Sequence, residues 1–244
     1  MTFTFAAEGL WKSFGRRPVL RNASLWGEAG RVTVLFGRNG SGKTTLVRAA
    51  LGLIRADTGV VLFGGHRYRR PTLPALAADG LFFLPDRDLF ADTVTLRGHF
   101  DAVAHRFPAV RGDDAAGALG IVELLDRRAF TLSGGERRRA EVALVEARRP
   151  LALIADEPFR GIAPRDAELV AARLRGLAEG GCAVMVTGHE TRVLLALADR
   201  VIWMTGGTTH ALGTAAEARS HEQFRREYLG SGAHAARRDA TPAR

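Results

Sequence analysis

Short apolar runs, separated by polar and helix-compatible stretches, recur along most of the chain. Runs of strand length occur at 32–36, 59–63, 81–84, 151–155, 183–187 and 201–204. Between several of them lie helical patterns, at 43–53, 136–148, 165–178 and 190–198. Strands that alternate with helices in this way are typical of a mainly parallel sheet covered by helices, so the pattern predicts an α/β fold.

Three segments depart from this alternation. Residues 2–30 combine short extended stretches with turn residues such as Gly9, Gly15 and Gly27, which predicts an N-terminal antiparallel β region. The strand pattern disappears after Pro85, and we predict a small helical subdomain over about 86–135. Residues 230–244 are polar and aperiodic, which is typical of a flexible tail. We therefore expect a single domain over 1–229, followed by that tail.

Composition and charge limit the possible partners. No apolar run approaches the ~18 residues that a membrane helix needs, so we expect no membrane-spanning helix. The first residues, MTFTFAAEGLW, lack the features of a secretion signal, which favours a cytoplasmic location. The formal charge of +9 comes mostly from arginines in scattered pairs such as Arg16-Arg17 and Arg148-Arg149. Because this charge forms no continuous stripe, no nucleic-acid partner is expected.

One motif between a strand pattern and a helix pattern has the composition of a phosphate-binding loop. It matches G-x-x-x-x-G-K-[ST] and consists of Gly37, Arg38, Asn39, Gly40, Ser41, Gly42, Lys43 and Thr44. Its glycines let backbone N–H groups turn toward phosphate oxygens, and the following helix adds its positive dipole end. We expect Lys43 to reach the β- and γ-phosphates, Thr44 to bind Mg²⁺, and Thr45 to donate to the α-phosphate.

Two adjacent carboxylates follow the apolar run 151–155. The carboxyl ends of parallel strands gather at one edge of a sheet, so Asp156 and Glu157 are expected beside the phosphate-binding loop. Asp156 is then placed to hold Mg²⁺, and Glu157 to act as general base on the attacking water. The alternative is a solvated Asp-Glu turn before Pro158, which the upstream Lys43 makes the weaker interpretation.

The sequence LSGGE at 132–136 is identical to the signature of the ATP-binding-cassette (ABC) family, which this chain therefore resembles. Ser133 and Glu136 have the spacing of a capping box at a helix start, and the two intervening glycines allow close backbone approach. The resemblance implies that Ser133, Gly134 and Gly135 cover the γ-phosphate of a nucleotide held by a second cassette.

Two further residues take their expected roles from the same resemblance. Phe14, ahead of the phosphate-binding loop, occupies the place of the aromatic residue that stacks on adenine; an ordinary core phenylalanine is the alternative. Thr187-Gly188-His189-Glu190 resembles the family's switch-histidine segment, which implies that His189 contacts the γ-phosphate and the attacking water. A structural histidine is the alternative there.

The resemblance extends from about residue 3 to Gly230 and implies a P-loop ABC ATPase fold. It implies an ATP-binding and ATP-hydrolysing transporter subunit that uses ATP and Mg²⁺. The implied partners are a second cassette, identical or different, paired head to tail, and an integral membrane permease that holds the chain at the inner face of the cell membrane. The segment FRREYLG at 224–230 resembles the ending of ATPases from the branched-chain amino acid and lipopolysaccharide transport groups.

Two positions depart from the family pattern. Asp86 stands where the family has Gln, and because a carboxylate can still bind Mg²⁺, we predict it as a metal ligand with Thr44 and Asp156. Ala163 stands where an Asp usually helps to connect the two sites. Two other functions stay open, a soluble ABC ATPase of the iron–sulfur assembly type and a nucleotide-gated regulatory module with little turnover.

Overall fold

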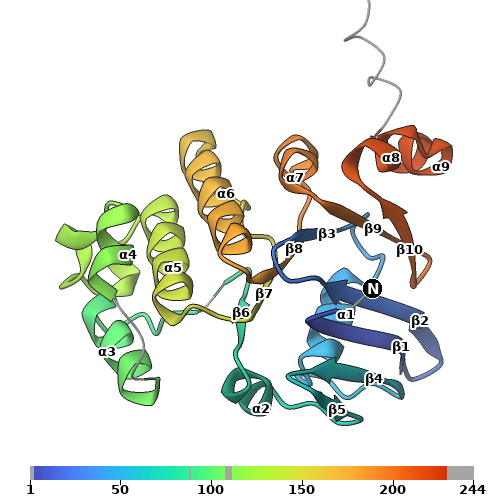
Figure 1. Ribbon diagram of the computed structural model, residues 1–244, viewed down its shortest axis with the longest axis horizontal. Helices are drawn as coiled ribbons and strands as arrows, with labels where there is room; N and C mark the ends of the chain where they lie inside the picture. Colours follow the sequence, from blue (N-terminus) through green and yellow to red (C-terminus); the bar gives the residue numbers. More distant parts are fainter. Residues whose placement is uncertain (1–2, 88, 108–111, 230–244) are drawn as a thin grey trace, which may run out of the picture.

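The first sheet is antiparallel and contains the N-terminal antiparallel β region that the sequence predicts. The computed structural model describes residues 3–87, 89–107 and 112–229. In the described part, β1 (Phe5–Phe14), β2 (Arg17–Gly27), β4 (Thr58–Phe63) and β5 (His66–Tyr68) form a sheet in the order β2-β1-β4-β5 (Figure 1). The predicted strand at 59–63 therefore belongs to this sheet and not to the parallel one. It pairs with β1, Phe5 opposite Phe63, because both strands bury apolar side chains in the same cluster.

The second sheet contains the alternating strands and is mainly parallel, as predicted. Its order is β10-β9-β3-β8-β7-β6, and all pairs are parallel except β9 with β10. The strands are β3 (Val32–Gly37), β6 (Leu81–Leu84), β7 (Ala152–Ala155), β8 (Ala183–Thr187), β9 (Arg200–Thr205) and β10 (Thr208–Gly213). Because β7, β8 and β3 are neighbours, the loops that follow them all leave the same edge of the sheet.

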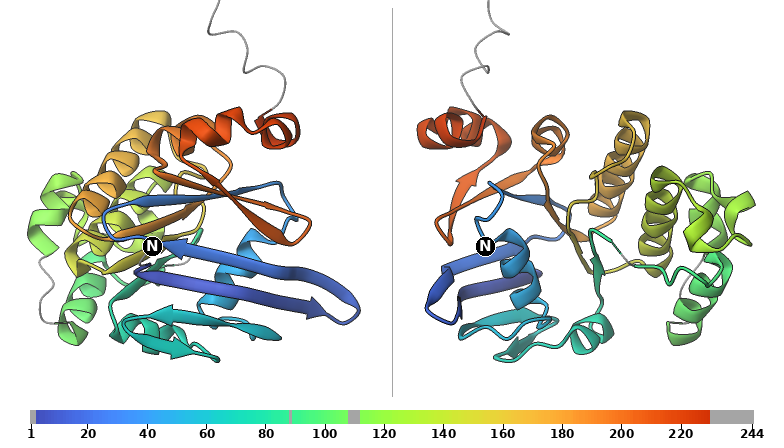
Figure 2. Two further views of the ribbon diagram at one scale, coloured as in Figure 1. Left: turned by 45° about the vertical axis from the view of Figure 1, so that its right-hand side comes forward. Right: turned by 180° about the vertical axis from the view of Figure 1, so that it is seen from behind.

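Helices cover both faces of this parallel sheet. Helix α1 (Lys43–Ala50) lies between the two sheets, and α2 (Leu73–Ala78) precedes β6 (Figures 1 and 2). The opposite face carries α5 (Gly134–Arg148), α6 (Pro164–Glu179) and α7 (Thr191–Leu197). Helices α3 (Leu96–Arg106) and α4 (Gly112–Ala118) lie beyond α5, far from the antiparallel sheet, with short 3₁₀ turns at Val122–Leu124 and Ala129–Thr131.

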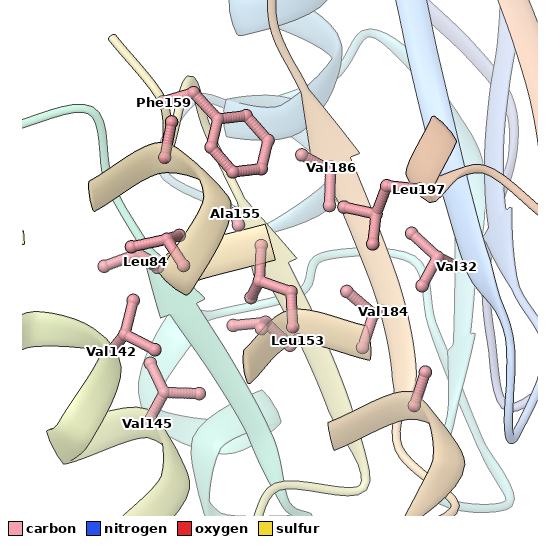
Figure 3. Close-up of a cluster of buried hydrophobic side chains, with 14 of the residues drawn as sticks. Val32, Leu84, Val142, Val145, Leu153, Ala155, Phe159, Val184, Val186 and Leu197 are labelled. Carbon is pink, nitrogen blue, oxygen red and sulfur yellow. The ribbon is translucent and has the colours of Figure 1, made fainter. Parts of the chain in front are cut away.

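The described residues form two buried apolar clusters, one on each face of the parallel sheet. Side chains alternate between them along a strand, so Leu153 belongs to the cluster under α5 to α7, and Ile154 to the cluster around α1. Figure 3 shows Leu153 and Val184 of the sheet together with Val142 and Val145 of α5. Burial on both faces fixes the strand ends, and therefore also the loops that carry polar side chains.

The C-terminal segment packs back onto the strand that leads into the phosphate-binding loop. After α8 (Ala215–Ser220), α9 (Glu222–Phe224) and a turn of π-helix (Arg225–Leu229), the rings of Phe224 and Tyr228 stack 5.3 Å apart. Both rings also pack against Phe36 of β3, with centroids 5.6 Å and 5.3 Å away. The Tyr228 hydroxyl donates to the carbonyl oxygen of Gly188 at 3.4 Å, so this segment supports the loop that carries His189.

Two remaining expectations concern the C-terminal tail and membrane-spanning helices. The predicted flexible tail, 230–244, lies outside the described residues. Within the part of the chain that the structure describes, no helix has the length and apolar character required to cross a bilayer.

Candidate active site

The phosphate-binding loop leaves β3 at Gly37 and enters α1 at Lys43. Gly40 and Gly42 have φ values of 78° and 108°, in the left-handed region that favours glycine. Gly42 is the N-cap residue of α1 and has no side chain to occupy the helix end, and no acidic residue lies in the first turn. The free N–H groups and the helix dipole therefore both face a space suited to an anion.

Lys43 is buried under this loop and is 6% exposed. Its Nζ donates to the carbonyl oxygens of Gly37, at 2.6 Å, and of Arg38, at 3.4 Å. Burial lowers the pKa of Lys43, and the charges of Glu157 and Asp156 partly oppose that effect. The buried Ser41 hydroxyl has no hydrogen-bond partner among the described residues. An ammonium and a hydroxyl group are thus both available to phosphate oxygens.

Asp156 and Glu157 follow β7 at the same edge, as the sequence predicts. The Thr187 hydroxyl, at the end of β8, donates to Asp156 Oδ1 and accepts a hydrogen bond from the backbone N–H of Glu157 at 3.1 Å. Burial raises the pKa of Asp156, an effect that the hydrogen bond from Thr187 opposes. Glu157 has a φ of 52°, a left-handed conformation that is uncommon for a residue with a side chain and is often found at functional sites.

His189 and Glu157 face each other across the site. Glu157 Oε1 lies 2.9 Å from His189 Nε2. Burial raises the pKa of Glu157 to about 7 and lowers the pKa of His189, so it favours the uncharged form of both side chains. The other oxygen of the carboxylate, Oε2, is buried and has no hydrogen-bond partner within the described part of the chain. This oxygen is therefore an unused hydrogen-bond acceptor of a residue that lines the cavity.

These groups line one cavity of about 1160 Å³, which reaches from the phosphate-binding loop to His189. Of the described residues that line it, seven are basic and three are acidic, an excess of positive charge that suits a polyphosphate. The loop residues Arg38, Asn39, Gly40, Ser41, Gly42, Lys43, Thr44 and Thr45 all contribute to its wall.

The residues present fit a magnesium ion that is bound together with phosphate. Thr44 and Asp156 both line the cavity, and Mg²⁺ in such sites usually takes one or two protein ligands, with phosphate oxygens and waters completing the shell. Among the described residues, no group of three or more His, Cys, Asp or Glu side chains could hold a metal ion without other ligands.

Asp86 lines the cavity too, but its carboxylate is engaged by a residue that the sequence did not single out. Arg160 Nη1 donates to Asp86 Oδ2 at 2.6 Å, which joins the loop after β7 to the loop after β6. The expected role of Asp86 as a metal ligand stays a prediction. The one signal for Arg160 in the sequence is its position three residues after Glu157.

Phe14 lies at the end of β1 and is 52% exposed, with the ammonium of Lys12 5.4 Å from its ring centroid. It is not among the described residues that line the cavity, whereas Arg17, Pro18 and Val19 of the next strand are. Its expected stacking on adenine therefore stays a prediction, and the alternative of a core phenylalanine is wrong.

The signature segment, 132–136, is not among the described residues that line this cavity. Ser133 is the N-cap of α5 and forms the predicted capping box: its backbone N–H donates to Glu136 Oε2 at 2.8 Å, and its hydroxyl accepts from the Glu136 N–H at 3.3 Å. Gly134 lines a second hollow, of about 370 Å³, together with Gly161. Gly135 leaves room for the Asp166 carboxylate, since a Cβ there would lie 2.1 Å from Oδ2.

Ala163, the other departure from the family pattern, is the N-cap residue of α6. Its side chain has no oxygen to accept the free N–H groups of the first helical turn, which begins with Pro164. The structure thus identifies a local consequence of this departure, an uncapped helix start beside the second hollow.

Comparisons with known proteins agree with this geometry. Residues 20–160 match the family described as ABC transporter. A probable ABC transporter ATP-binding protein from Azorhizobium caulinodans is 33% identical over 233 residues, which cover 93% of this chain and 83% of the relative. The lipopolysaccharide export system ATP-binding protein LptB of Escherichia coli K12 is 31% identical over 234 residues, covering 93% and 97%.

Solved structures show the same fold. The crystal structure of the ADP conformation of MJ1267, an ATP-binding cassette of an ABC transporter, superposes with a TM-score of 0.82 at 22% identity. The superposition covers 94% of this chain and all of that one. The cbiO1 subunit from Clostridium perfringens, part of the ABC transporter complex cbiONQ, gives a TM-score of 0.75 at 20% identity and covers 93% and 94% of the two chains.

Proposed function

The chain belongs to the ABC transporter family as an ATP-binding subunit, and from that premise we propose that it hydrolyses ATP to drive a separate membrane permease. The observation that carries the proposal is the convergence of Lys43, Glu157 and His189 on one cavity, with Glu157 Oε1 2.9 Å from His189 Nε2. Convergence of a buried cation, a carboxylate with a raised pKa and a histidine is what water-dependent phosphoryl transfer requires.

In this proposal each group acts on ATP or on the attacking water. Lys43 exchanges its bonds to the loop carbonyls for bonds to phosphate oxygens, and Ser41 gains an acceptor for its buried hydroxyl. Glu157 accepts the proton of the attacking water on its carboxylate, and His189, 2.9 Å from Oε1, orients that carboxylate. Mg²⁺, held by Thr44 and Asp156, would neutralise negative charge on the phosphates.

We further propose that two cassettes pair head to tail around ATP. The exposed Ser133 and Gly134 lie outside the cavity of their own protomer and start a helix whose N–H groups are suited to a phosphate. A two-fold symmetric pair would place this segment over the partner's nucleotide. The permease would hold the pair at the inner face of the cell membrane, through the helical subdomain at about 86–135 of the single domain 1–229.

The variant E157Q tests this function. It keeps the size of the side chain but cannot accept a proton, so we expect ATP binding to persist and phosphate release to fall by at least ~100-fold. ATP should then hold the variant as a dimer that size-exclusion chromatography separates from the monomer. E168Q, which removes a charge from an exposed position of α6, is the matched control and should retain wild-type turnover. Turnover of the wild-type level in E157Q would refute the assignment of the base.

A further inference from the structure

Arg160 lines the same cavity as the proposed base Glu157, but it belongs to none of the motifs that were predicted from the sequence. Its backbone N–H donates to the carbonyl oxygen of Glu157 at 3.1 Å, which closes a turn immediately after the proposed base. The turn returns the Arg160 side chain to the wall of the same cavity that Lys43 and His189 line. That side chain is 53% exposed, so burial does not fix its position.

An ion pair with Asp86 fixes the position of the Arg160 side chain instead. Arg160 Nη1 donates to Asp86 Oδ2 at 2.6 Å, while Arg87, whose side chain is 71% exposed, lies 3.9 Å from the same oxygen. A guanidinium group has five N–H donors, and this bond uses one of them, so donors remain to face the cavity.

The backbone of Asp86 is held by hydrogen bonds from α5, the helix that begins in the LSGGE sequence. Arg138 donates to the carbonyl oxygens of Pro85, at 3.1 Å, and of Asp86, at 2.8 Å. Arg138 also pairs with Glu141 at 2.9 Å, and both of these side chains are buried in α5. A rigid helix therefore determines where the Asp86 carboxylate lies, and through it where the Arg160 guanidinium lies.

Lys43 and Arg160 are two of the seven basic residues that line the cavity in the described part of the chain, and both lie close to its carboxylates. Asp86, Asp156 and Glu157 all line it, and a terminal phosphate entering among three carboxylates would be repelled. Lys43 supplies one positive charge from the loop side. Arg160 lies close to His189 as well: burial and Lys43 lower the pKa of that histidine most, and the charge of Arg160 adds to the effect.

We propose that Arg160 donates hydrogen bonds to the terminal phosphate of bound ATP, and that Asp86 is the positioning residue that holds its guanidinium ready. This inference rests on the proposed function and adds a substrate-contacting residue to it. Asp86 and Arg160 then act together: the pair has no net charge, but it presents N–H donors to the cavity.

The first test compares ATP with ADP, which lacks the terminal phosphate, in equilibrium binding to the purified full chain. R160A removes charge-assisted hydrogen bonds, so we expect its affinity for ATP to fall about 10- to 100-fold and its affinity for ADP to change less than about twofold. R160K, which keeps the charge, should recover part of the loss. R219A removes the same side chain from an exposed position of α8 and should bind both nucleotides like the wild type. Retained ADP binding also reports that each variant is folded.

The double variant D86N/R160A separates this role from simple charge compensation. If Arg160 touches the phosphate, removing both partners leaves ATP affinity about as low as in R160A. If Arg160 merely neutralises Asp86, the double variant returns to the wild-type affinity, and the proposal is overturned. An unchanged ratio of ATP to ADP affinity in R160A would overturn it equally.

The outcome also distinguishes this inference from the function on which it rests. A wild-type chain that binds neither nucleotide would refute both. A wild-type chain that binds and hydrolyses ATP, with an R160A variant that does the same, would refute the role of Arg160 and leave the proposed function intact.

Discussion

The raised pKa of Glu157 leads to a prediction about the stability of the protein that can be tested without measuring ATP hydrolysis. Its carboxyl group has an ordinary pKa of 4.5, and burial raises this pKa to about 7 in the folded chain. The variant E157Q removes the titrating group but keeps its volume. In the nucleotide-free protein, we expect E157Q to be more stable than the wild type at pH 8, by an amount that follows from the raised pKa.

The size and the pH window follow from linkage. Each pKa unit corresponds to about 1.4 kcal/mol, so a rise from 4.5 to about 7 corresponds to about 3 kcal/mol. Because the folded pKa is raised, the contribution of Glu157 to stability is fully present below pH 4.5, where both states are protonated. This stabilising contribution falls as the pH rises from 4.5 to about 7, because the folded chain then binds more protons than the unfolded chain. It is lost above about pH 7.

Urea denaturation from pH 4 to pH 8.5, followed by tryptophan fluorescence, measures this difference. The free energy of unfolding of E157Q minus that of the wild type should increase by about 3 kcal/mol between pH 4.5 and pH 7.5, and then level off. The exposed-site variant E168Q provides the matched control and should show no such increase. A difference that stays constant across this range would refute the conclusion that burial raises the pKa of Glu157.

Three further predictions concern the surroundings of the site. A163D supplies the oxygen that the start of α6 lacks, so the free energy of unfolding should rise by about 1 kcal/mol, seen as a higher thermal midpoint; a lower midpoint would contradict the capping argument. R138M leaves the buried Glu141 with the weaker of its two ion pairs, to Arg137 at 3.6 Å, and should lower the free energy of unfolding by about 2 kcal/mol or more in urea titrations, whereas R138M/E141M should recover part of the loss; equal losses in both variants would contradict this account of the pair. G52A should be destabilised by about 2 kcal/mol or more in the same titrations, because its φ is 71° and a Cβ would lie 1.9 Å from the Pro71 carbonyl oxygen; a stability like that of the wild type would show that this turn relaxes easily.

Local patterns were enough to predict most of the elements. Strands such as 183–187 and helices such as 165–178 follow from a periodicity that the structure confirms within about a residue or two. The strand at 59–63 was placed in the wrong sheet, because periodicity identifies a strand without naming its partner. Here the partner is β1, more than fifty residues earlier, and burial shared with Phe5 decides the pairing.

The motif residues could be predicted from the sequence alone, because phosphate binding requires particular residue types at a fixed local spacing. Lys43 and the glycines before it act through backbone conformation and the start of a single helix, and Ser133 and Glu136 cap one helix turn. Interactions of this kind span a few residues, so a short string of letters is sufficient to specify them.

The tertiary structure decided which of these residues meet. Glu157 reaches His189, and Asp86 reaches Arg160, because strand order brings the ends of β6, β7 and β8 to one edge of the sheet. The separation of Asp86 and Arg160 along the chain carries no periodic signal, and their contact depends on the packing of α5 against the loop after β6. The chain's own sequence therefore determined the chemistry that is available, and long-range packing determined which charges act together.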